Sequence, residues 1–480
     1  MSFVSFDYIF IFFPIVIGIY FFLTKKHLVI GANIWLVVAS LFFYGYLNPT
    51  YLLPLILCSI CFNFAIGSGL NNLKFKSKIG KKALLTFGIV CNLLLISYFK
   101  YMDFFIENIN VLFHSNLSLL NIALPLGISF FTFTQTAYLV DSYQGKTKEY
   151  DFLNYALFVT FFPHLVAGPI LHHSEMMPQF GDIKSKVLKY KNVAIGLFLF
   201  VIGLFKKVIL ADTLSNYVAL GYGPEVHLSF LEGWIVALSY TFQIYFDFSG
   251  YTDMALGGAK MFNIDLPINF NSPYKASSIQ DFWRRWHITL SRFLRDYVYI
   301  PLGGSKVGEL KTYRNLFLTF LIGGLWHGAS WMFVIWGALH GFALGVNRLW
   351  RRFNISMPKW INVFLTFMFV NITWVFFRAE NMSQASKIFK AMVNFSDFKF
   401  PKIHTTSLEF LGPQSNQYEK LLFILPLAFI LVFACKNSNE IMEKLKFTWI
   451  KALICFCVFC FVIWILLKRT QVSEFIYFNF

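Results

Sequence analysis

Apolar runs of about 17 to 25 residues recur along almost the whole of this 480-residue chain. An α-helix needs about 20 such residues to cross the hydrocarbon core of a bilayer. The runs do not alternate between polar and apolar residues, as the strands of a transmembrane barrel would. Composition agrees, because only 14% of the residues are charged, against about 25% in a typical soluble domain. The sequence predicts an all-α polytopic membrane protein with roughly twelve crossings.

Positive charge gathers in short loops between the apolar runs. The formal net charge is +17, and the strongest basic loop of the first half, KFKSKIGKK, covers residues 74–82. Lys and Arg beside membrane spans mark the cytoplasmic side and attract anionic lipid. We therefore expect this charge to contact membrane lipids and not nucleic acid.

One apolar run is interrupted. Residues 152–171 contain Pro163 and the pair Gly168-Pro169, and both flanks have the character of cytoplasmic loops. Irregular backbone at membrane depth is tolerated only where protein or a water-filled cavity surrounds it. The run is predicted to be a broken, re-entrant helix that forms one wall of an internal cavity.

The stretch 281–341 holds the strongest candidates for chemistry, and we interpret it as the active-site region. It begins DFWRRWHITLSRFLRDYVYIPLGG and ends GGLWHGASWMFVIWGALHG, so that His287 and His327 each follow a tryptophan. An ionisable group inside a membrane protein is expensive to keep and indicates function. His327, near the turn of a hairpin expected over 316–346, fits a neutral imidazole that takes a proton from a hydroxyl in acyl transfer. It fits equally a buried histidine that ties two helices together.

Four arginines surround His287 in residues 278–300, where arginine alternates with aromatic residues as in a helix lying in the inner membrane interface. Their guanidinium groups suit the phosphates of an anionic cofactor at the cytoplasmic mouth. The alternative is a positively charged anchor with snorkelling side chains. The four are Arg284, Arg285, Arg292 and Arg295.

Other polar groups near this stretch are expected to be structural. Residues 241–274 are rich in Gly, Asn and Pro, and we expect partly buried, non-helical backbone there. Asp247, Asp253 and Asp281 are expected to balance the arginines as buried pairs. His340 is expected to support the fold.

The sequence predicts no metal site. His172, His173 and Glu175 resemble a metal cluster only superficially, because adjacent histidines on a cytoplasmic edge are usually solvated. The seven cysteines all lie within or at the ends of apolar runs and form no disulfide framework.

The last residues of the chain, FIYFNF, require burial. Alternating aromatic side chains would promote aggregation if they were left in water. The expected topology puts residues 468–480 outside, where the outer mouth of the bundle is the nearest apolar cavity. Tyr477 would then place its hydroxyl in a cavity above His327. The alternative is an aromatic anchor at the membrane interface.

Four segments resemble the membrane-bound O-acyltransferase family, in its bacterial cell-envelope branch. They are FFPHLVAGPI, YFDFSGYTDMALG, LPINFNSPYKASSIQDFWRRWHITLSRFLRDYVYIPLGG and GGLWHGASWMFVIWGALHG. The resemblance implies one integral-membrane domain over residues 1–480. Its expected architecture is a ring of about 11 to 12 transmembrane helices, with re-entrant and interfacial helices, around a thinned central core where opposing funnels meet. His327 matches the invariant histidine of the family, and His287 matches its second histidine.

The resemblance also implies a reaction. In this branch the acyl donor comes from the cytoplasm and the acyl group passes outward to a periplasmic partner of the SGNH hydrolase type. FIYFNF is similar to a C-terminal aromatic motif whose tyrosine, here Tyr477, is proposed to accept the acyl group. We therefore expect a subunit of the bacterial inner membrane that uses acetyl-CoA as donor substrate and has no tightly bound cofactor. The expected acceptor is a cell-envelope polysaccharide, first peptidoglycan and second an alginate-like polymer.

Three alternatives stay open. Within the family, the chain could transfer D-alanine from a carrier protein towards teichoic acid, and binding of the carrier in place of acetyl-CoA would show this. A transporter of acyl groups is expected to have repeated halves and to work without residues 473–480. A scaffold that only localises the partner would not need His327.

Overall fold

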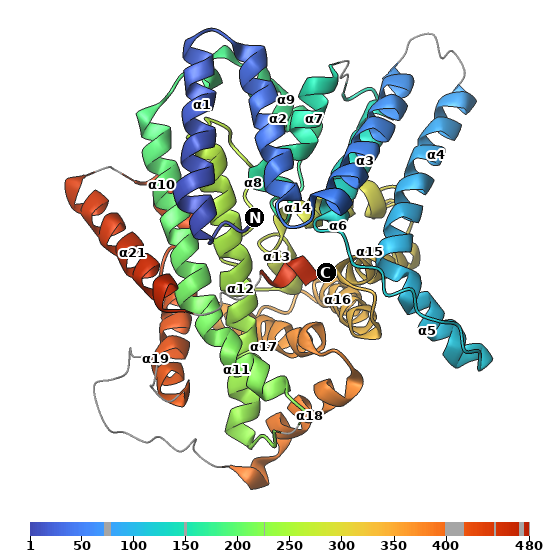
Figure 1. Cartoon of the computed structure of the whole chain (residues 1–480). Helices are drawn as coiled ribbons and strands as arrows, with labels where there is room; N and C mark the ends of the chain where they lie inside the picture. The colour runs from blue at the N-terminus through green and yellow to red at the C-terminus, as the bar shows by residue number, and fades with distance from the viewer. Residues whose placement is uncertain are drawn as a thin grey trace. The chain divides into compact units, whose positions relative to one another are not determined.

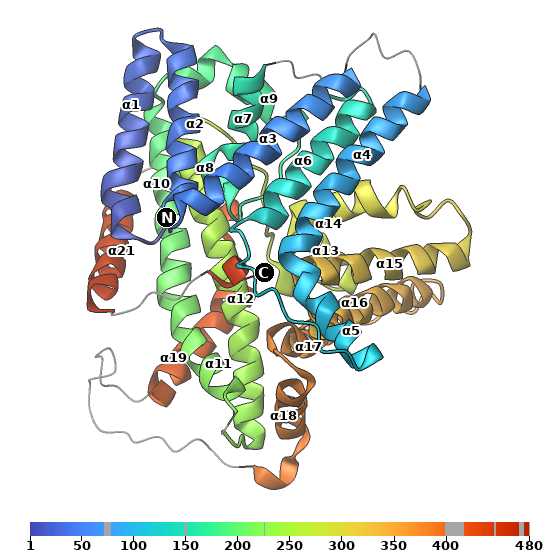
Figure 2. The same ribbon diagram turned by 45° about the vertical axis from the view of Figure 1, so that its right-hand side comes forward.

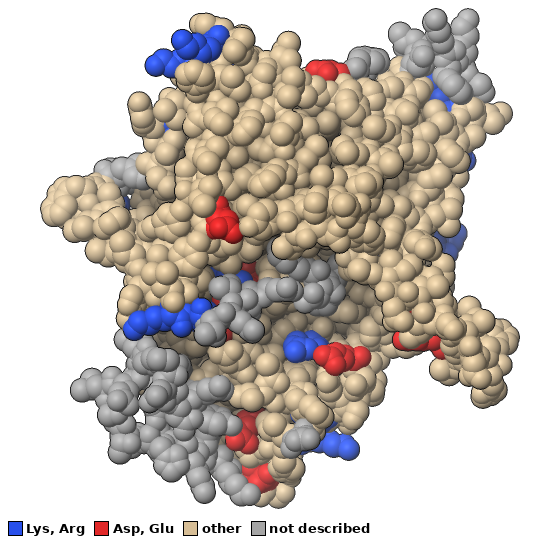
Figure 3. Space-filling view, viewed as in Figure 1, with Lys and Arg blue, Asp and Glu red and all other residues tan. Residues whose placement is uncertain are grey.

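The computed structural model describes residues 1–71, 78–147, 151–224, 226–398, 417–445, 448–469 and 475–479 (Figure 1). Every regular element in these ranges is helical. Within them, seven helices are long and apolar enough to cross a membrane, and the helices Val29–Gly45 and Phe423–Ala434 are apolar but shorter. The face seen in Figure 3 carries few charged side chains. The prediction of an all-α, multi-pass membrane protein is confirmed.

The described chain divides into two compact units. The first contains Met1–Phe200, Tyr251–Pro267 and Tyr477–Asn479, and the second contains Val201–Gly250 and Ile268–Ile476. The prediction of one domain over residues 1–480 stays a prediction.

The first unit is built from helices packed side by side. Helix α1 lies against α2, while α3, α4 and α6 pack on one another (Figure 2). The side-chain amides of Asn63 and Asn92 exchange two hydrogen bonds of 3.2 and 2.7 Å between α3 and α4. Such bonds join helices where no water is present. The elements are η1 (Asp7–Phe12), α1 (Phe13–Lys25), α2 (Val29–Gly45), α3 (Pro49–Asn71), α4 (Lys78–Ile96), η2 (Ser97–Tyr101), α5 (Met102–Phe113), α6 (Ile128–Tyr143), α7 (Phe152–Thr160), α8 (Phe162–Leu165), α9 (His173–Gly181), η3 (Ile183–Lys186) and most of α10 (Tyr190–Phe205).

The interrupted run is broken as predicted. Helix α7 ends at Thr160, Phe161 leaves helical geometry at φ −48° and ψ 107°, and α8 lasts only four residues. This segment is buried almost throughout. Residues 115–127 are irregular and α6 starts at Ile128, because Gly127 has a left-handed φ of 69° that ends the preceding segment.

The second unit holds the predicted active-site stretch. Helix α12 begins in this unit and ends in the first one. The elements are η4 (Lys206–Ala211), α11 (Asp212–Tyr222), α12 (Phe230–Met261), η5 (Pro273–Lys275), α13 (Ile279–Trp283), α14 (Ile288–Leu294), η6 (Arg295–Tyr299), α15 (Glu309–His327), α16 (Trp331–Trp350), α17 (Lys359–Arg378), α18 (Met382–Val393), η7 (Phe395–Asp397), α19 (Gln417–Phe429), η9 (Ile430–Ala434), α20 (Ser438–Glu443), α21 (Trp449–Lys468) and the first residue of η10 (Ile476–Asn479).

Helices α15 and α16 form a tight antiparallel hairpin, which confirms the predicted one. A Cβ at Gly324 would lie 2.3 Å from the Phe333 carbonyl oxygen, so the two backbones touch where glycine faces glycine. Small residues allow such close approach between membrane helices. The connection consists of Gly328, Ala329 and Ser330.

Two local predictions were wrong. Helix α12 runs to Met261, so only residues 262–272 of the expected non-helical segment lie outside helical structure. Its glycines serve close contacts instead of turns: a Cβ at Gly257 would lie 2.5 Å from the Gly196 carbonyl oxygen. Residues 278–300 do not form one interfacial helix either. His287 adopts a left-handed conformation with φ 41° and separates α13 from α14, while η6 continues α14 as a π-helical turn.

Replacing Gly337 by Ala should destabilise the hairpin. The added Cβ would lie 2.5 Å from the Phe320 carbonyl oxygen and 3.1 Å from the Gly324 Cα, so backbone must move. Overpacking of this kind costs about 1 to 3 kcal/mol, and we expect a lower Tm of the purified protein in detergent. The control is Gly18→Ala in α1, where no heavy atom lies within 4 Å of the added Cβ. An equal Tm for the two variants would contradict the close approach.

Candidate active site

His287 is held by a loop that pairs with the chain on both sides of it. The Asn269 carbonyl oxygen accepts from the Ile288 N–H at 3.0 Å, and the Asn271 N–H donates to the Arg285 carbonyl oxygen at 2.9 Å. These two bonds align residues 269–271 with the break between α13 and α14. The loop therefore fixes the left-handed turn at His287.

Asn269 also selects the tautomer of His287. Its side-chain Oδ1 accepts from the Thr289 N–H at 3.1 Å and lies 3.2 Å from His287 Nδ1. Because a backbone N–H donates to this atom, Oδ1 is an acceptor, and His287 Nδ1 must carry the proton that it donates to Oδ1. The lone pair is then on Nε2, which makes Nε2 the basic atom of the ring.

Burial keeps His287 neutral. The residue has no exposed surface and lies outside the candidate membrane helices. Loss of solvation lowers the pKa of His287 to about 3. At neutral pH this imidazole is therefore a base without charge.

His327 is the last residue of α15 and lies at the turn of the hairpin, as predicted. It is 2% exposed. Its ring centroid is 5.0 Å from that of Trp326, 5.1 Å from that of Trp336 and 5.0 Å from that of Phe377. The ring centroid of Trp326 also lies 6.0 Å from that of His287, so one indole contacts both imidazoles. The arrangement places two buried imidazoles in an aromatic environment that excludes water.

His340 has structural contacts, as expected. The Trp283 Nε1–H donates to His340 Nδ1 at 3.2 Å, so Nε2 carries the proton and donates to Thr373 Oγ1 at 3.1 Å. These bonds join α13, α16 and α17. His340 is therefore an interhelical tie.

The C-terminal tail, residues 468–480, approaches His287 through Phe475, which contacts Phe248 beside the imidazole. The ring of Phe475 lies 5.7 Å from that of Phe248, which meets the His287 ring edge-on at 4.8 Å. Phe475 and Tyr477 are each 4% exposed, and the expected burial is confirmed for both. Side chains of the last three residues lie outside the described part. Tyr477 belongs to the first unit, and its place above His327 stays a prediction.

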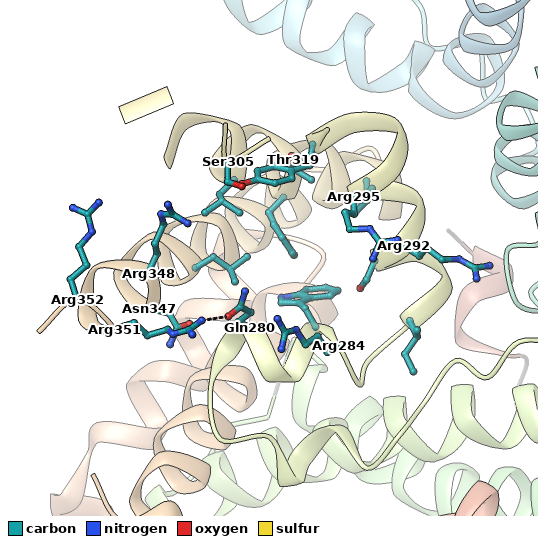
Figure 4. A pocket seen from close by; sticks show the side chains of 18 residues that line it. Gln280, Arg284, Arg292, Arg295, Ser305, Thr319, Asn347, Arg348, Arg351 and Arg352 are labelled. Atoms are coloured by element: carbon teal, nitrogen blue, oxygen red, sulfur yellow. Dashed lines mark hydrogen bonds between the residues drawn. The ribbon is translucent and has the colours of Figure 1, made fainter. Parts of the chain in front are cut away.

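Three of the four predicted arginines line a cavity of about 840 Å³ in the second unit (Figure 4). They are Arg284, Arg292 and Arg295. Arg285 does not line it: its Nε donates to Asp281 Oδ1 at 2.8 Å, and its Nη1 lies 3.4 Å from the Asn271 carbonyl oxygen. Arg285 is therefore separated from the other three arginines, and its predicted part in donor binding stays a prediction.

Three further arginines enter this cavity from the end of α16. They are Arg348, Arg351 and Arg352 (Figure 4). The Arg351 Nη1–H donates to Gln280 Oε1 at 2.8 Å, while Glu309 binds Arg348 at 3.2 Å and also Arg352. The hydrogen bond from Arg348 lowers the pKa of Glu309.

The sequence contained a signal for these three arginines that our interpretation missed. An antiparallel hairpin returns its last residues to the level of its first ones, so the arginines after residue 346 had to approach the start of α15. Their position as the basic end of a span suggested only cytoplasmic orientation.

The predicted aspartate pairs have mixed outcomes. Asp281 binds Arg285, but their side chains are 27% and 33% exposed, so the pair is not buried as expected. Asp247 binds Lys207 at 2.6 Å and no member of the arginine set, because α12 continues through it and turns it towards η4. Asp253 is buried. Among the described residues, no group of three or more His, Cys, Asp or Glu could hold a metal ion.

Comparison with known proteins agrees with these motifs. The model of the membrane-bound O-acyltransferase family matches residues 41–383, a range that holds both histidines and all six cavity arginines. The chain is 45% identical to a peptidoglycan O-acetyltransferase of Helicobacter pylori, across 93% of this chain and 91% of that protein. It is 39% identical to a probable alginate O-acetylase, AlgI, of Pseudomonas aeruginosa, across 85% and 78%. A teichoic acid D-alanyltransferase of Bacillus subtilis is 28% identical across 52% and 66%.

Because of His287, the free energy of unfolding should decrease as the pH is lowered below about 6.5. The unfolded imidazole binds a proton near pH 6.5, whereas the folded one does so only near pH 3. Between these values the unfolded state binds more protons, so acidification favours it. From pH 7.5 to pH 5 this costs about 2 kcal/mol. Thermal unfolding at the two pH values measures the loss.

The His287→Gln variant isolates this contribution. Its Tm should fall less between pH 7.5 and pH 5 than that of the wild type, whatever its Tm at pH 7.5. His227→Gln, at a histidine whose side chain is 84% exposed, controls for the substitution itself. Equal losses in the wild type and in His287→Gln would show that burial of this ring does not govern its protonation.

Proposed function

The chain belongs to the membrane-bound O-acyltransferase family, and we propose that it takes acetyl from cytoplasmic acetyl-CoA and passes it across the inner membrane for O-acetylation of a cell-envelope polysaccharide, most directly peptidoglycan. The support for acetyl and for this acceptor is the similarity to the Helicobacter pylori peptidoglycan O-acetyltransferase, which extends over nearly the whole of both chains. A periplasmic partner of the SGNH hydrolase type receives the acetyl group in this proposal.

The observation that carries the proposal is the pair of buried imidazoles that one indole contacts. Neither ring has more than a trace of solvent exposure, so a proton taken up there is not exchanged directly with water.

His327 takes the proton of the Tyr477 hydroxyl, and the phenolate oxygen attacks the thioester carbonyl. The C–S bond breaks, the proton passes to the thiolate, and an acetyl ester of Tyr477 remains. Serine of the partner then attacks this ester and releases the phenol. Because a phenol has a pKa near 10, it is a workable leaving group.

The cavity with six arginines is the proposed donor site. A coenzyme A thioester carries three phosphate groups, and guanidinium groups bind phosphate through paired, charge-assisted hydrogen bonds. A volume of about 840 Å³ lies in the range of cavities that hold ligands of this kind. Arg348 and Arg352 already bind the Glu309 carboxylate, an anion that phosphate can replace.

Incubation of purified protein with acetyl-CoA should place acetyl on the tail peptide that contains Tyr477. Mass spectrometry of that peptide measures the adduct, which should be absent in Tyr477→Phe and in His327→Ala. Tyr46→Phe, which removes an exposed hydroxyl bonded to Asp7, should leave the adduct intact. If no adduct forms while Tyr477→Phe still abolishes envelope acetylation in cells, transfer is direct. If an aminoacyl carrier protein acylates the tail where acetyl-CoA does not, the D-alanyl alternative is correct.

Removing one cavity arginine should weaken donor use without changing the maximal rate. A hydrogen bond to a charged group contributes about 1.5 to 3 kcal/mol, so Arg284→Gln should raise the half-saturating acetyl-CoA concentration by about 10- to 100-fold. Arg285→Gln is the matched control, because the neighbouring residue lies outside the cavity lining. Equal effects at the two positions would place the donor elsewhere.

A further inference from the structure

A charge cluster that the candidate site does not use lies inside the second unit. Lys207 Nζ is 2.9 Å from Asp212 Oδ1 and 2.6 Å from Asp247 Oδ1, while Arg469 Nη1 is 3.1 Å from Asp212 Oδ2. The side chains of Lys207, Asp212 and Asp247 are no more than 4% exposed. Two cations and two anions balance one another, as buried charges must. Such a group in a membrane protein indicates a function.

The cluster binds the tail at two places. Arg469 is the residue directly after α21. At the other end of the tail, the Ile476 N–H donates to Asp247 Oδ2 at 2.8 Å. Ile476 is the residue before Tyr477. The tail therefore contributes Arg469 to the cluster and is bound to it again at Ile476.

Helix α12 adds a second contact at the same turn. Phe248 follows Asp247, and its ring lies 5.7 Å from that of Phe475. Asp247 and Phe248 thus hold consecutive tail residues, one through a hydrogen bond and one through a ring contact. Since Phe248 also meets His287, these contacts fix the tail beside a candidate catalytic ring.

The local backbone is built to bring Lys207 to Asp247. A Cβ at Gly250 would lie 2.8 Å from the Gly203 carbonyl oxygen and 3.1 Å from the Lys207 backbone nitrogen, so α12 approaches the end of α10 with no side chain between them. Lys207 lies in η4, a π-helical turn. The wider turn changes the direction of the side chains that follow α10, and such turns occur often at functional sites.

We propose that Lys207, Asp212, Asp247 and Arg469 form a tail anchor that positions the C-terminal segment for acyl transfer. The proposal rests on the proposed function in taking Tyr477 as the acyl carrier. Asp247 is a positioning residue: it binds the amide next to Tyr477, so the hydroxyl of the carrier is presented from a fixed backbone position. An ion cluster that served only to stabilise the fold would balance its charges without this amide.

Hydrogen–deuterium exchange of the full-length protein in detergent tests the anchor apart from the chemistry. In Asp247→Asn the amide group keeps the shape of the carboxylate but loses its charge. Exchange of the C-terminal peptide should then accelerate about 10-fold or more, as expected when a hydrogen bond to a charged group is lost, while peptides of α15 and α16 exchange as in the wild type. The side chain of Arg469 is 24% exposed, so Arg469→Gln is the second variant if Asp247→Asn does not fold. It should also accelerate exchange of the C-terminal peptide. The control Asp265→Asn breaks a surface ion pair with Lys260 and should leave the exchange unchanged.

Acetylation of Tyr477 in the same variants tests positioning. The maximal rate of adduct formation should fall about 10-fold or more, while the half-saturating acetyl-CoA concentration stays at the wild-type value. Wild-type exchange of the C-terminal peptide in a folded Asp247→Asn or Arg469→Gln variant would overturn the anchor. Faster exchange with an undiminished rate would overturn the positioning role. If wild-type protein forms no adduct, the proposed function fails, and the exchange data alone decide whether the cluster holds the tail.

Discussion

The close approach of α15 and α16 determines where both candidate sites in the second unit lie. Glycine faces glycine at Gly324 and Gly337, so the two helices run together along their length. The turn presents His327 at one end, and the returning helix brings its arginines back to Glu309 at the other. A 19-residue helix is about 28 Å long. In the proposed reaction, a donor whose phosphates bind the α16 arginines would have to reach about that far towards His327.

Burial decides the chemistry of each polar group in this apolar chain. Loss of water makes His287 a neutral base, and Asn269 then determines which nitrogen is basic. The same loss of water makes an unpaired charge untenable, so Lys207 binds two carboxylates. The arginines of the cavity differ because they line open space, although those at the end of α16 also bind Glu309 and Gln280. Six guanidinium groups around one cavity favour an anionic ligand, whereas the buried cluster already balances two cations with two anions.

Local patterns allowed part of this arrangement to be predicted. The apolar runs determine the all-α membrane class, and a histidine between tryptophan and glycine at a hairpin turn pointed to His327. Arg284 and Arg285 could not be separated, because neighbouring helical residues differ by about 100° in direction and the helix breaks two residues later, at His287. Asn269 was missed because it reaches His287 through an irregular loop. Helix α12 was mistaken for irregular backbone because its glycines were interpreted as turn residues, and the helices that they contact are distant in sequence.

The contacts at Asp247 and Phe248 connect these parts. One turn of α12 binds the tail backbone, packs against Phe475 and touches His287. An acyl carrier must be held while it is loaded, yet its acyl group must remain transferable to a partner. Asp247 and Phe248 orient the tail through a backbone hydrogen bond and a ring contact, and in the proposed transfer these would hold the segment next to Tyr477. Lys207 in η4 binds Asp247 at 2.6 Å, so the carboxylate that accepts from the tail amide is itself held by a residue outside the tail.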